Sequence, residues 1–238
     1  RDGFEVGDRV TWTIADSYGK CPACTEYGLP EKCSELFKYG HASIHKGSGL
    51  NGCYATHIHI RKGTHLVKVL GIYACGLLKE MGVPQIFCLE VKEERFALIE
   101  QFGAIAVDAR DAQKATQFIL GQVGDGVDAV FEVAGIKQLI PQGLELLRPG
   151  GDYVLVGLVH PDSELGITAE QVIRKCLTIT GVHNYAPWHL DESVAFLERN
   201  HDHFPFESLV SPPYELKELE AAVHEAQQQK WARVSVKP

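Results

Sequence analysis

The hydrophobic and polar positions follow two different patterns along the chain, and the change falls near Leu70. Up to Val69 the apolar runs are short, residues 9–14 and 54–60 look like strands, and Cys, Gly, His and Pro crowd the stretch between them. From Gly71 onward, helical and strand-like periods alternate with short breaks, which is typical of a parallel sheet with crossover helices. The pattern therefore predicts a small β-rich segment followed by an α/β domain.

The periodicity of the α/β part places its elements. Helices are expected at residues 72–81, 93–102, 112–122, 137–147, 169–175, 190–200 and 216–229. Strands are expected at residues 85–90, 104–107, 129–133, 152–159, 177–182, 208–210 and 232–236. The apolar runs at 130–133 and 153–156 are nearly continuous, as in strands covered on both faces. We therefore expect a doubly wound parallel sheet.

Composition and charge exclude several classes of function. With 45% apolar and 23% charged residues, the 238-residue chain has the composition of a soluble globular protein. Its net charge of -8 is spread along the chain without a Lys/Arg cluster, so we expect no nucleic-acid partner. No apolar run reaches the ~18 residues of a membrane span, so we expect no membrane association.

Cysteine usage indicates a reducing compartment. The chain has seven cysteines, an odd number, and four of them lie singly in apolar or mixed stretches. These four are Cys53, Cys75, Cys88 and Cys176. This pattern is typical of reduced thiols and not of a disulfide framework, so we expect a cytoplasmic protein.

The other three cysteines form a candidate metal site. Cys21 and Cys24 make a Cys-x-x-Cys pair, whose sulfurs can meet Zn²⁺ at ~2.3 Å, and Cys33 can supply a third thiolate. The alternatives are a redox pair and three incidental cysteines. The strand and helix that usually flank a redox pair are missing. The spacing therefore favours a structural zinc, which would take no part in chemistry. The candidates for its fourth ligand are Asp16, Glu26 and His41.

The order of these features resembles the zinc-containing medium-chain dehydrogenases. The chain has Gly-Asp-Arg-Val at residues 7–10, the cysteine loop, Gly-Cys-Tyr-Ala at 52–55 and then the α/β part. Residues 28–33, Gly-Leu-Pro-Glu-Lys-Cys, resemble the lobe of zinc-type alcohol dehydrogenases, which usually holds four cysteines where this chain has three. The resemblance implies an incomplete GroES-like segment with a zinc lobe at 1–69 and a Rossmann-like nucleotide-binding domain at 70–238.

The resemblance also assigns the nucleotide site. Glu90 is similar to the acidic residue that accepts the adenosine ribose hydroxyls, which favours NAD over NADP because a carboxylate repels a 2′-phosphate. Arg95 resembles the basic residue beside the adenosine, and Gly71 the last glycine of the phosphate-binding turn. For Glu90 and Arg95 the alternative is a solvated charge at a strand end or in a first helical turn.

Two strand ends resemble the segments that line the nicotinamide. They contribute Val133, Gly135, Val156, Gly157 and Leu158. As plain structure, both are strand-to-loop breaks, although Gly157 would let the backbone approach a cofactor closely. Arg233 is similar to an arginine that contacts the pyrophosphate.

Several family features have no match. The ligands of the catalytic zinc are missing, so we assign no catalytic residue, and we expect that a part upstream of Arg1 has been lost. The first strand of the nucleotide fold and most of its Gly-rich turn, expected between Val69 and Leu70, are also missing. Residues 65–70 could take the place of that strand, but Lys68 would then be buried or forced to snorkel, which disfavours this arrangement.

Two functional hypotheses follow. The first is an NAD(H)-linked oxidoreductase whose complete form transfers hydride between an alcohol or aldehyde and nicotinamide. The alternative is a catalytically inactive remnant that binds a nucleotide or pairs with another subunit. Under either hypothesis the resemblance implies a homodimer through the edge strand at residues 176–182.

Overall fold

The computed structural model describes residues 15–39, 71–158, 161–228 and 230–237. The chain divides into two compact units, a first unit of residues 1–68 and 184–238 and a second unit of residues 69–183. The second unit contains most of the predicted α/β part. Residues 184–238, which the sequence pattern places in the α/β domain, are grouped with the first unit, and the division at residues 69 and 70 stays a prediction.

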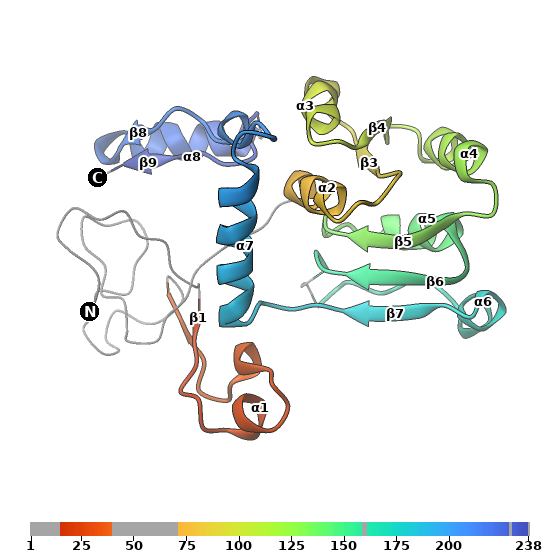
Figure 1. The fold of residues 1–238 in the computed structure, drawn as a ribbon, viewed down its shortest axis with the longest axis horizontal. Helices are drawn as coiled ribbons and strands as arrows, with labels where there is room; N and C mark the ends of the chain where they lie inside the picture. Colours follow the sequence, from red (N-terminus) through yellow and green to blue (C-terminus); the bar gives the residue numbers. More distant parts are fainter. Residues whose placement is uncertain (1–14, 40–70, 159–160, 229, 238) are drawn as a thin grey trace. The chain divides into compact units, whose positions relative to one another are not determined.

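The second unit contains two parallel sheets (Figure 1). Strand β3 (Phe87–Glu90) pairs with β4 (Ile105–Asp108). Strands β5 (Val127–Glu132), β6 (Leu147–Leu155) and β7 (Thr178–Gly181) follow one another in the order β5-β6-β7. All pairs in both sheets are parallel, so the carboxyl ends of neighbouring strands meet at one edge.

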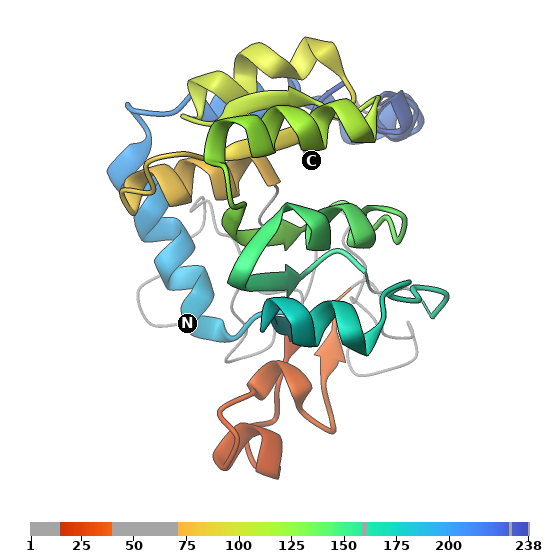
Figure 2. The ribbon, with the colours of Figure 1, turned by 90° about the vertical axis from the view of Figure 1, so that its right-hand side faces the viewer.

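Helices connect these strands, and two of them begin at side-chain caps. The helical elements are α2 (Gly71–Glu80), η2 (Glu93–Arg95), α3 (Phe96–Gln101), α4 (Ala112–Val123), α5 (Leu139–Leu146) and α6 (Ala169–Lys175). Asp111 caps α4, where its carboxylate accepts a hydrogen bond from the Lys114 amide at 3.1 Å. Thr168 and Gln171 form a capping box at α6. Figure 2 shows α4, α5 and α6 one below another along this unit.

Two apolar clusters hold these helices on the sheets. In the first, buried Val107, Ala115, Ile119 and Leu146 join β4, α4 and α5. In the second, the buried residues Ile140, Leu144, Leu147 and Tyr153 join α5 to β6. Partly buried side chains of β5 pack against both clusters, so the two sheets share one core layer with these helices.

Between β3 and β5 the layer is interrupted. Phe87 of β3 and Val127 and Val130 of β5 pack against the same apolar cluster, yet the two strands belong to separate sheets. Within the described ranges no strand pairs with the free edge of either one. This is the arrangement of a doubly wound sheet that lacks its central first strand. Residues 65–70, the substitute considered for that strand, lie outside the described residues.

The N-terminal part of the first unit is built from short elements. Antiparallel strands β1 (Ala15–Asp16) and β2 (Phe37–Lys38) enclose α1 (Pro22–Thr25) and η1 (Pro30–Lys32). The C-terminal part of the unit contains α7 (Pro187–Asn200), η3 (Phe206–Leu209), β8 (Tyr214–Glu215), η4 (Leu216–Glu218), α8 (Leu219–Gln228) and β9 (Val236–Lys237). Strands β8 and β9 pair in parallel.

Two predicted strands differ from the structure. Of residues 232–236, only Val236 lies in a strand, β9, and Arg233 makes an isolated bridge. Residues 208–210 were expected to be extended, but η3 occupies most of them because the Ser208 amide donates to the Pro205 carbonyl at 3.0 Å. Only Val210 bridges a distant residue, Arg233. The strands predicted at residues 9–14 and 54–60 lie outside the described part. Among the helices of the described ranges, none has the length and apolar character needed to span a membrane.

Candidate functional site

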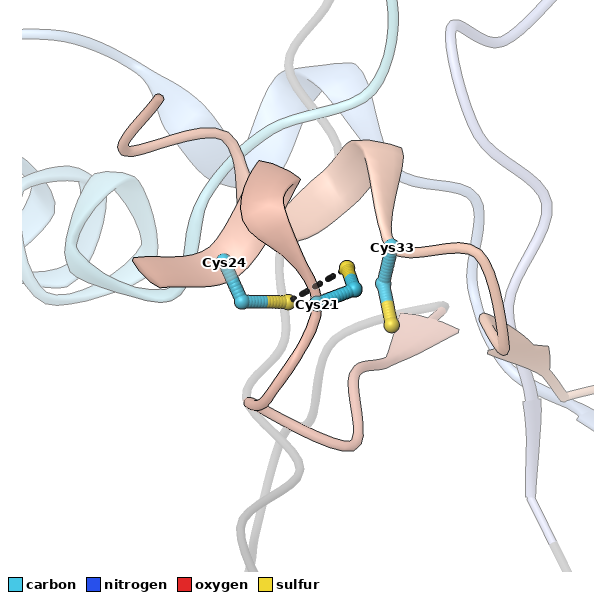
Figure 3. A group of neighbouring side chains, drawn as sticks. All are labelled: Cys21, Cys24 and Cys33. Carbon is cyan, nitrogen blue, oxygen red and sulfur yellow. Dashed lines mark hydrogen bonds between the residues drawn. The ribbon is translucent and has the colours of Figure 1, made fainter. Parts of the chain in front are cut away.

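The three cysteines of the loop converge in the first unit (Figure 3). Their sulfur atoms all lie within 4.8 Å of one another, and the Cys21 and Cys24 sulfurs are 3.5 Å apart. Cys21 precedes α1 and has the extended backbone of an N-cap. The Cys24 amide donates a hydrogen bond to the Cys21 carbonyl at 2.8 Å. Cys33 follows η1, whose single turn brings the third sulfur beside the other two. Local structure alone therefore assembles the cluster.

These spacings fit a tetrahedral metal. Sulfurs bound to Zn²⁺ at ~2.3 Å lie roughly 3.8 Å apart along the edges of a tetrahedron. The Cys21 and Cys33 side chains are buried and that of Cys24 is partly buried, as in a closed structural site. Among the described residues, the cluster of possible metal ligands consists of these three cysteines and includes neither Asp16 nor Glu26. His41, the remaining candidate ligand, lies outside the described residues.

The hydrogen bonds of the loop favour thiolate at one of the three positions. A hydrogen bond from the Ser34 backbone lowers the pKa of the Cys21 thiol to about 6. Burial has the opposite effect on its neighbour and raises the pKa of Cys24. A thiolate is the form of cysteine that binds metal, so Cys21 is prepared for a cation at neutral pH.

Glu90 lies at the carboxyl end of β3, as expected from the sequence. One carboxylate oxygen accepts hydrogen bonds from the Val91 amide at 2.8 Å and the Lys92 amide at 3.0 Å. The other accepts from the Arg95 guanidinium at 3.0 Å. The structure therefore brings Glu90 and Arg95 together as an ion pair with a fixed carboxylate, which differs from the solvated charges of the alternative interpretation.

A second ion pair, which the sequence analysis missed, lies beside the first. Asp108 ends β4 opposite Glu90, and its carboxylate accepts the Arg110 guanidinium at 2.6 Å and 2.8 Å. These hydrogen bonds lower the pKa of Asp108 to about 2. Arg110 also lies 3.5 Å from the Glu93 carboxylate. The carboxyl ends of β3 and β4 thus carry charges of both signs. In the sequence, one acidic residue ends the strand predicted at 85–90, and the other directly follows the strand predicted at 104–107.

The turns that follow β5 and β6 touch through two glycines. Gly135 has a positive φ of 75°, and a Cβ atom added there would lie 2.9 Å from the Gly157 carbonyl oxygen. A Cβ atom on Gly157 would lie 2.5 Å from the Gly135 nitrogen and 2.7 Å from the Val133 carbonyl carbon. Both positions therefore need glycine for the chain's own packing, a reason that the sequence analysis did not give for Gly157.

The remaining predicted nucleotide residues lie in both units. Gly71 opens α2, and a Cβ atom there would lie 3.1 Å from a methyl group of Val133, so helix and strand end pack closely. The Val133 and Val156 side chains are exposed, whereas Leu158 is partly buried against the second apolar cluster. Arg233 belongs to the first unit, where its amide donates to the Leu209 carbonyl at 3.0 Å.

Glu132 is a further residue of this edge that sequence reasoning missed. It is the last residue of β5, only 4% of it is exposed, and it accepts a hydrogen bond from the Gly135 amide at 2.7 Å. The signal was available, because a carboxylate interrupts an apolar run that is predicted to be covered on both faces.

Comparison with known proteins identifies the family. The family profile described as zinc-binding dehydrogenase matches residues 69–199, which is more than half of the chain. The chain belongs to the zinc-binding dehydrogenase family. The matched residues include the whole described part of the second unit and therefore both strand-end turns.

Individual dehydrogenases align with shorter or longer parts of the chain. (R,R)-butanediol dehydrogenase from Bacillus subtilis is 28% identical over 49% of this chain and 33% of its own length. Sorbitol dehydrogenase from Halalkalibacterium halodurans is 27% identical over 93% of this chain and 74% of its own length. The chain thus spans a third of the butanediol dehydrogenase that it matches.

A solved structure supports the fold of the described residues. A zinc-binding dehydrogenase from Sinorhizobium meliloti, determined with bound NADP, superimposes with a TM-score of 0.81 and 19% sequence identity. The match covers 100% of this chain and 78% of that protein. The Rossmann-like fold expected from the sequence is therefore confirmed for this member of the zinc-binding dehydrogenase family.

Proposed function

We propose that the chain is part of an NAD(H)-linked oxidoreductase, whose complete form transfers hydride between an alcohol or aldehyde and nicotinamide. The observation that carries the proposal is the position of Glu90, residues 133–135 and residues 156–158. Glu90 ends β3, and the other two segments directly follow β5 and β6, so all lie at carboxyl ends of parallel strands, on both sides of the interruption between β3 and β5. In doubly wound sheets this point, where the strand order reverses, is where dinucleotides bind.

The residues present fit the two halves of a dinucleotide. The fixed Glu90 carboxylate would accept the adenosine ribose hydroxyls, and Arg95 would lie beside the adenosine. The turns at Gly135 and Gly157, which expose backbone at the next strand ends, would line the nicotinamide. Bound nicotinamide supplies the hydride chemistry, while these residues bind and orient it. The names of the butanediol and sorbitol dehydrogenases favour a small alcohol as substrate.

We propose that the site prefers NAD to NADP because of the charge on Glu90. The carboxylate receives two amide hydrogen bonds and one guanidinium, so it is held in place at the position where a 2′-phosphate would lie. Two negative groups at that distance repel each other. Arg95 reduces this repulsion, although its donor is already engaged by the carboxylate.

Replacing Glu90 with alanine tests this assignment. We expect the Kd for NADH to rise about 10- to 100-fold, because hydrogen bonds to a charged group are lost. The Kd for NADPH should stay the same or fall, since the repulsion is removed. Fluorescence titration of the full chain with both nucleotides measures these changes. Glu93→Ala is the matched control, because this carboxylate lies one turn away and is 73% exposed. Equal weakening in both variants, or none in Glu90→Ala, would refute the assignment.

For the first unit we propose a structural zinc on Cys21, Cys24 and Cys33. The support is the convergence of three sulfurs at distances that suit a tetrahedral ion. The redox alternative needs a Cys-x-x-Cys pair at the start of a helix that follows a strand of a thioredoxin-like unit. Here Cys21 caps and Cys24 lies within a helix of only four residues, and the strands on either side of this loop have two residues each. The zinc would stabilise the loop and supply no catalysis.

We further propose that the chain forms a homodimer through β7. Within the described residues β7 pairs only with β6, so its outer edge carries unpaired amides and carbonyls. Two such edges can pair antiparallel about a twofold axis. Light scattering during size-exclusion chromatography should give twice the chain mass of 26.3 kDa. Ile179→Pro removes a strand amide and should lower the measured mass to that of a monomer. A monomeric wild-type chain would contradict the proposal.

A further inference from the structure

Glu132 joins the two strand-end turns of the second unit. Its side-chain oxygen accepts hydrogen bonds from the Gly135 amide at 2.7 Å and the Ile136 amide at 3.4 Å. Its backbone carbonyl accepts from the amides of Val156 and Gly157, both at 2.9 Å. One residue therefore holds the turn after β5 with its side chain and the turn after β6 with its main chain.

The two turns cannot move independently. The backbone atoms of Gly135 and Gly157 leave no space for a Cβ atom between them, so a shift of either turn displaces the other. The Glu132 carboxylate fixes the first turn through amides, and contact of glycine backbones transmits that position to the second. Loss of the carboxylate would release both turns together.

The carboxylate is costly to bury, which makes its presence informative. Among the described residues its second oxygen, Oε2, is buried and has no hydrogen-bond partner. Its charge acts on the buried Tyr153, whose pKa rises to about 12, first through burial and second through the charge of Glu132. A leucine of similar size would avoid the desolvation cost but would leave the Gly135 amide without its acceptor. The hydrogen bond to the turn is therefore the contribution that only this side chain makes.

We propose that Glu132 is a positioning residue for the nicotinamide half of the dinucleotide. It would act through the turns at Gly135 and Gly157 and would make no contact with the cofactor itself. The inference rests on the proposed function and deepens it, because it separates the residue that sets the nicotinamide position from Glu90, which would bind the adenosine half. The two halves should therefore respond differently to substitution.

The test compares two ligands on the full chain. NADH carries both halves, whereas ADP-ribose carries the adenosine and pyrophosphate without the nicotinamide ring. We expect Glu132→Ala to raise the Kd for NADH about tenfold, as for loss of one or two hydrogen bonds. The Kd for ADP-ribose should change by less than about twofold on the same argument. Glu132→Gln keeps an acceptor for the Gly135 amide and should restore NADH binding to near the wild-type value.

Hydrogen exchange without ligand provides the second readout. Amides 135, 136, 156 and 157 should exchange faster in Glu132→Ala and not in Glu132→Gln, whereas Glu145→Gln, an exposed control on α5, should leave them unchanged. If Glu132→Ala weakens the binding of NADH and ADP-ribose equally, or leaves the binding of both unchanged, the inference is overturned while the proposed function stands. If the wild-type chain binds neither ligand, the proposed function fails, and unchanged exchange at the four amides would also reject the positioning role.

Discussion

Gly157→Ala is expected to lower the free energy of unfolding by roughly 1–3 kcal/mol and to weaken NADH binding at least about tenfold. The added Cβ would lie 2.5 Å from the Gly135 nitrogen and 2.7 Å from the Val133 carbonyl carbon. These are backbone atoms that no rotamer change can move, so the two strand-end turns must separate. Urea unfolding followed by circular dichroism, together with NADH titration, measures both effects.

Gly121→Ala is the matched control for this prediction. Gly121 lies inside α4, and a Cβ atom there would meet nothing within 4 Å. Alanine is the better helix former, so this variant should be more stable by about 0.5–1 kcal/mol, with unchanged NADH binding. If Gly157→Ala behaves like Gly121→Ala, the close contact between the two turns does not exist in solution, and the positioning role of Glu132 fails with it.

The helices of the second unit could be predicted closely because they carry their own boundary signals. For α6 the predicted and observed bounds agree, since Thr168 and Gln171 form a capping box and Lys175 ends the last turn. Strand β6 shows the limit of such signals. It begins at Leu147, five residues before the predicted start, and includes Pro149, Gly150 and Gly151, which are typical of a turn. A register shift against β5 accommodates them, and only tertiary pairing reveals it.

The site was only partly predictable, and the reason differs for each residue. The cysteine cluster followed from spacing, because α1 and η1 are local turns that bring three nearby sulfurs together. Glu90 was assigned from the family resemblance, at the end of a predicted strand. Glu132 and the contact between Gly135 and Gly157 depend on two strands that pair over a distance in sequence. No local pattern specifies such a contact, although a carboxylate inside an apolar run indicates a buried acceptor.

The division of the chain into two units is also not specified by local sequence patterns. The apolar periodicity of residues 190–200 and 216–229 is that of ordinary helices, and both helices exist as α7 and α8. Periodicity gives the type of an element but not the unit with which it packs, because an amphipathic face fits any apolar partner. Residues 184–238 are grouped with the first unit because of contacts between segments far apart in the sequence, such as the hydrogen bond that the Asn184 side-chain amide donates to the Glu31 carbonyl at 3.4 Å.

Cys21→Ser and Cys24→Ser are expected to reduce bound zinc from about one ion per chain to almost none. Each substitution removes one of three thiolates, and a hydroxyl is a much poorer zinc ligand at neutral pH. Because metal binding is linked to folding, the cysteine loop should also unfold at a lower temperature. Its free energy of unfolding should fall by several kcal/mol. Elemental analysis after dialysis and calorimetry of the same samples measure both.

The choice of control separates a metal site from three unrelated thiols. Cys176→Ser removes an exposed thiol that follows α6 in the second unit, so zinc content and the unfolding temperature of the loop should remain unchanged. Cys33→Ser distinguishes the zinc site from a redox pair, because a redox pair would not need Cys33. If Cys33→Ser keeps the wild-type properties and oxidant joins Cys21 to Cys24, whose sulfurs are already 3.5 Å apart, the loop is a redox pair and the structural zinc is refuted. If zinc is lost in all three loop variants and kept in Cys176→Ser, the three sulfurs act as one site.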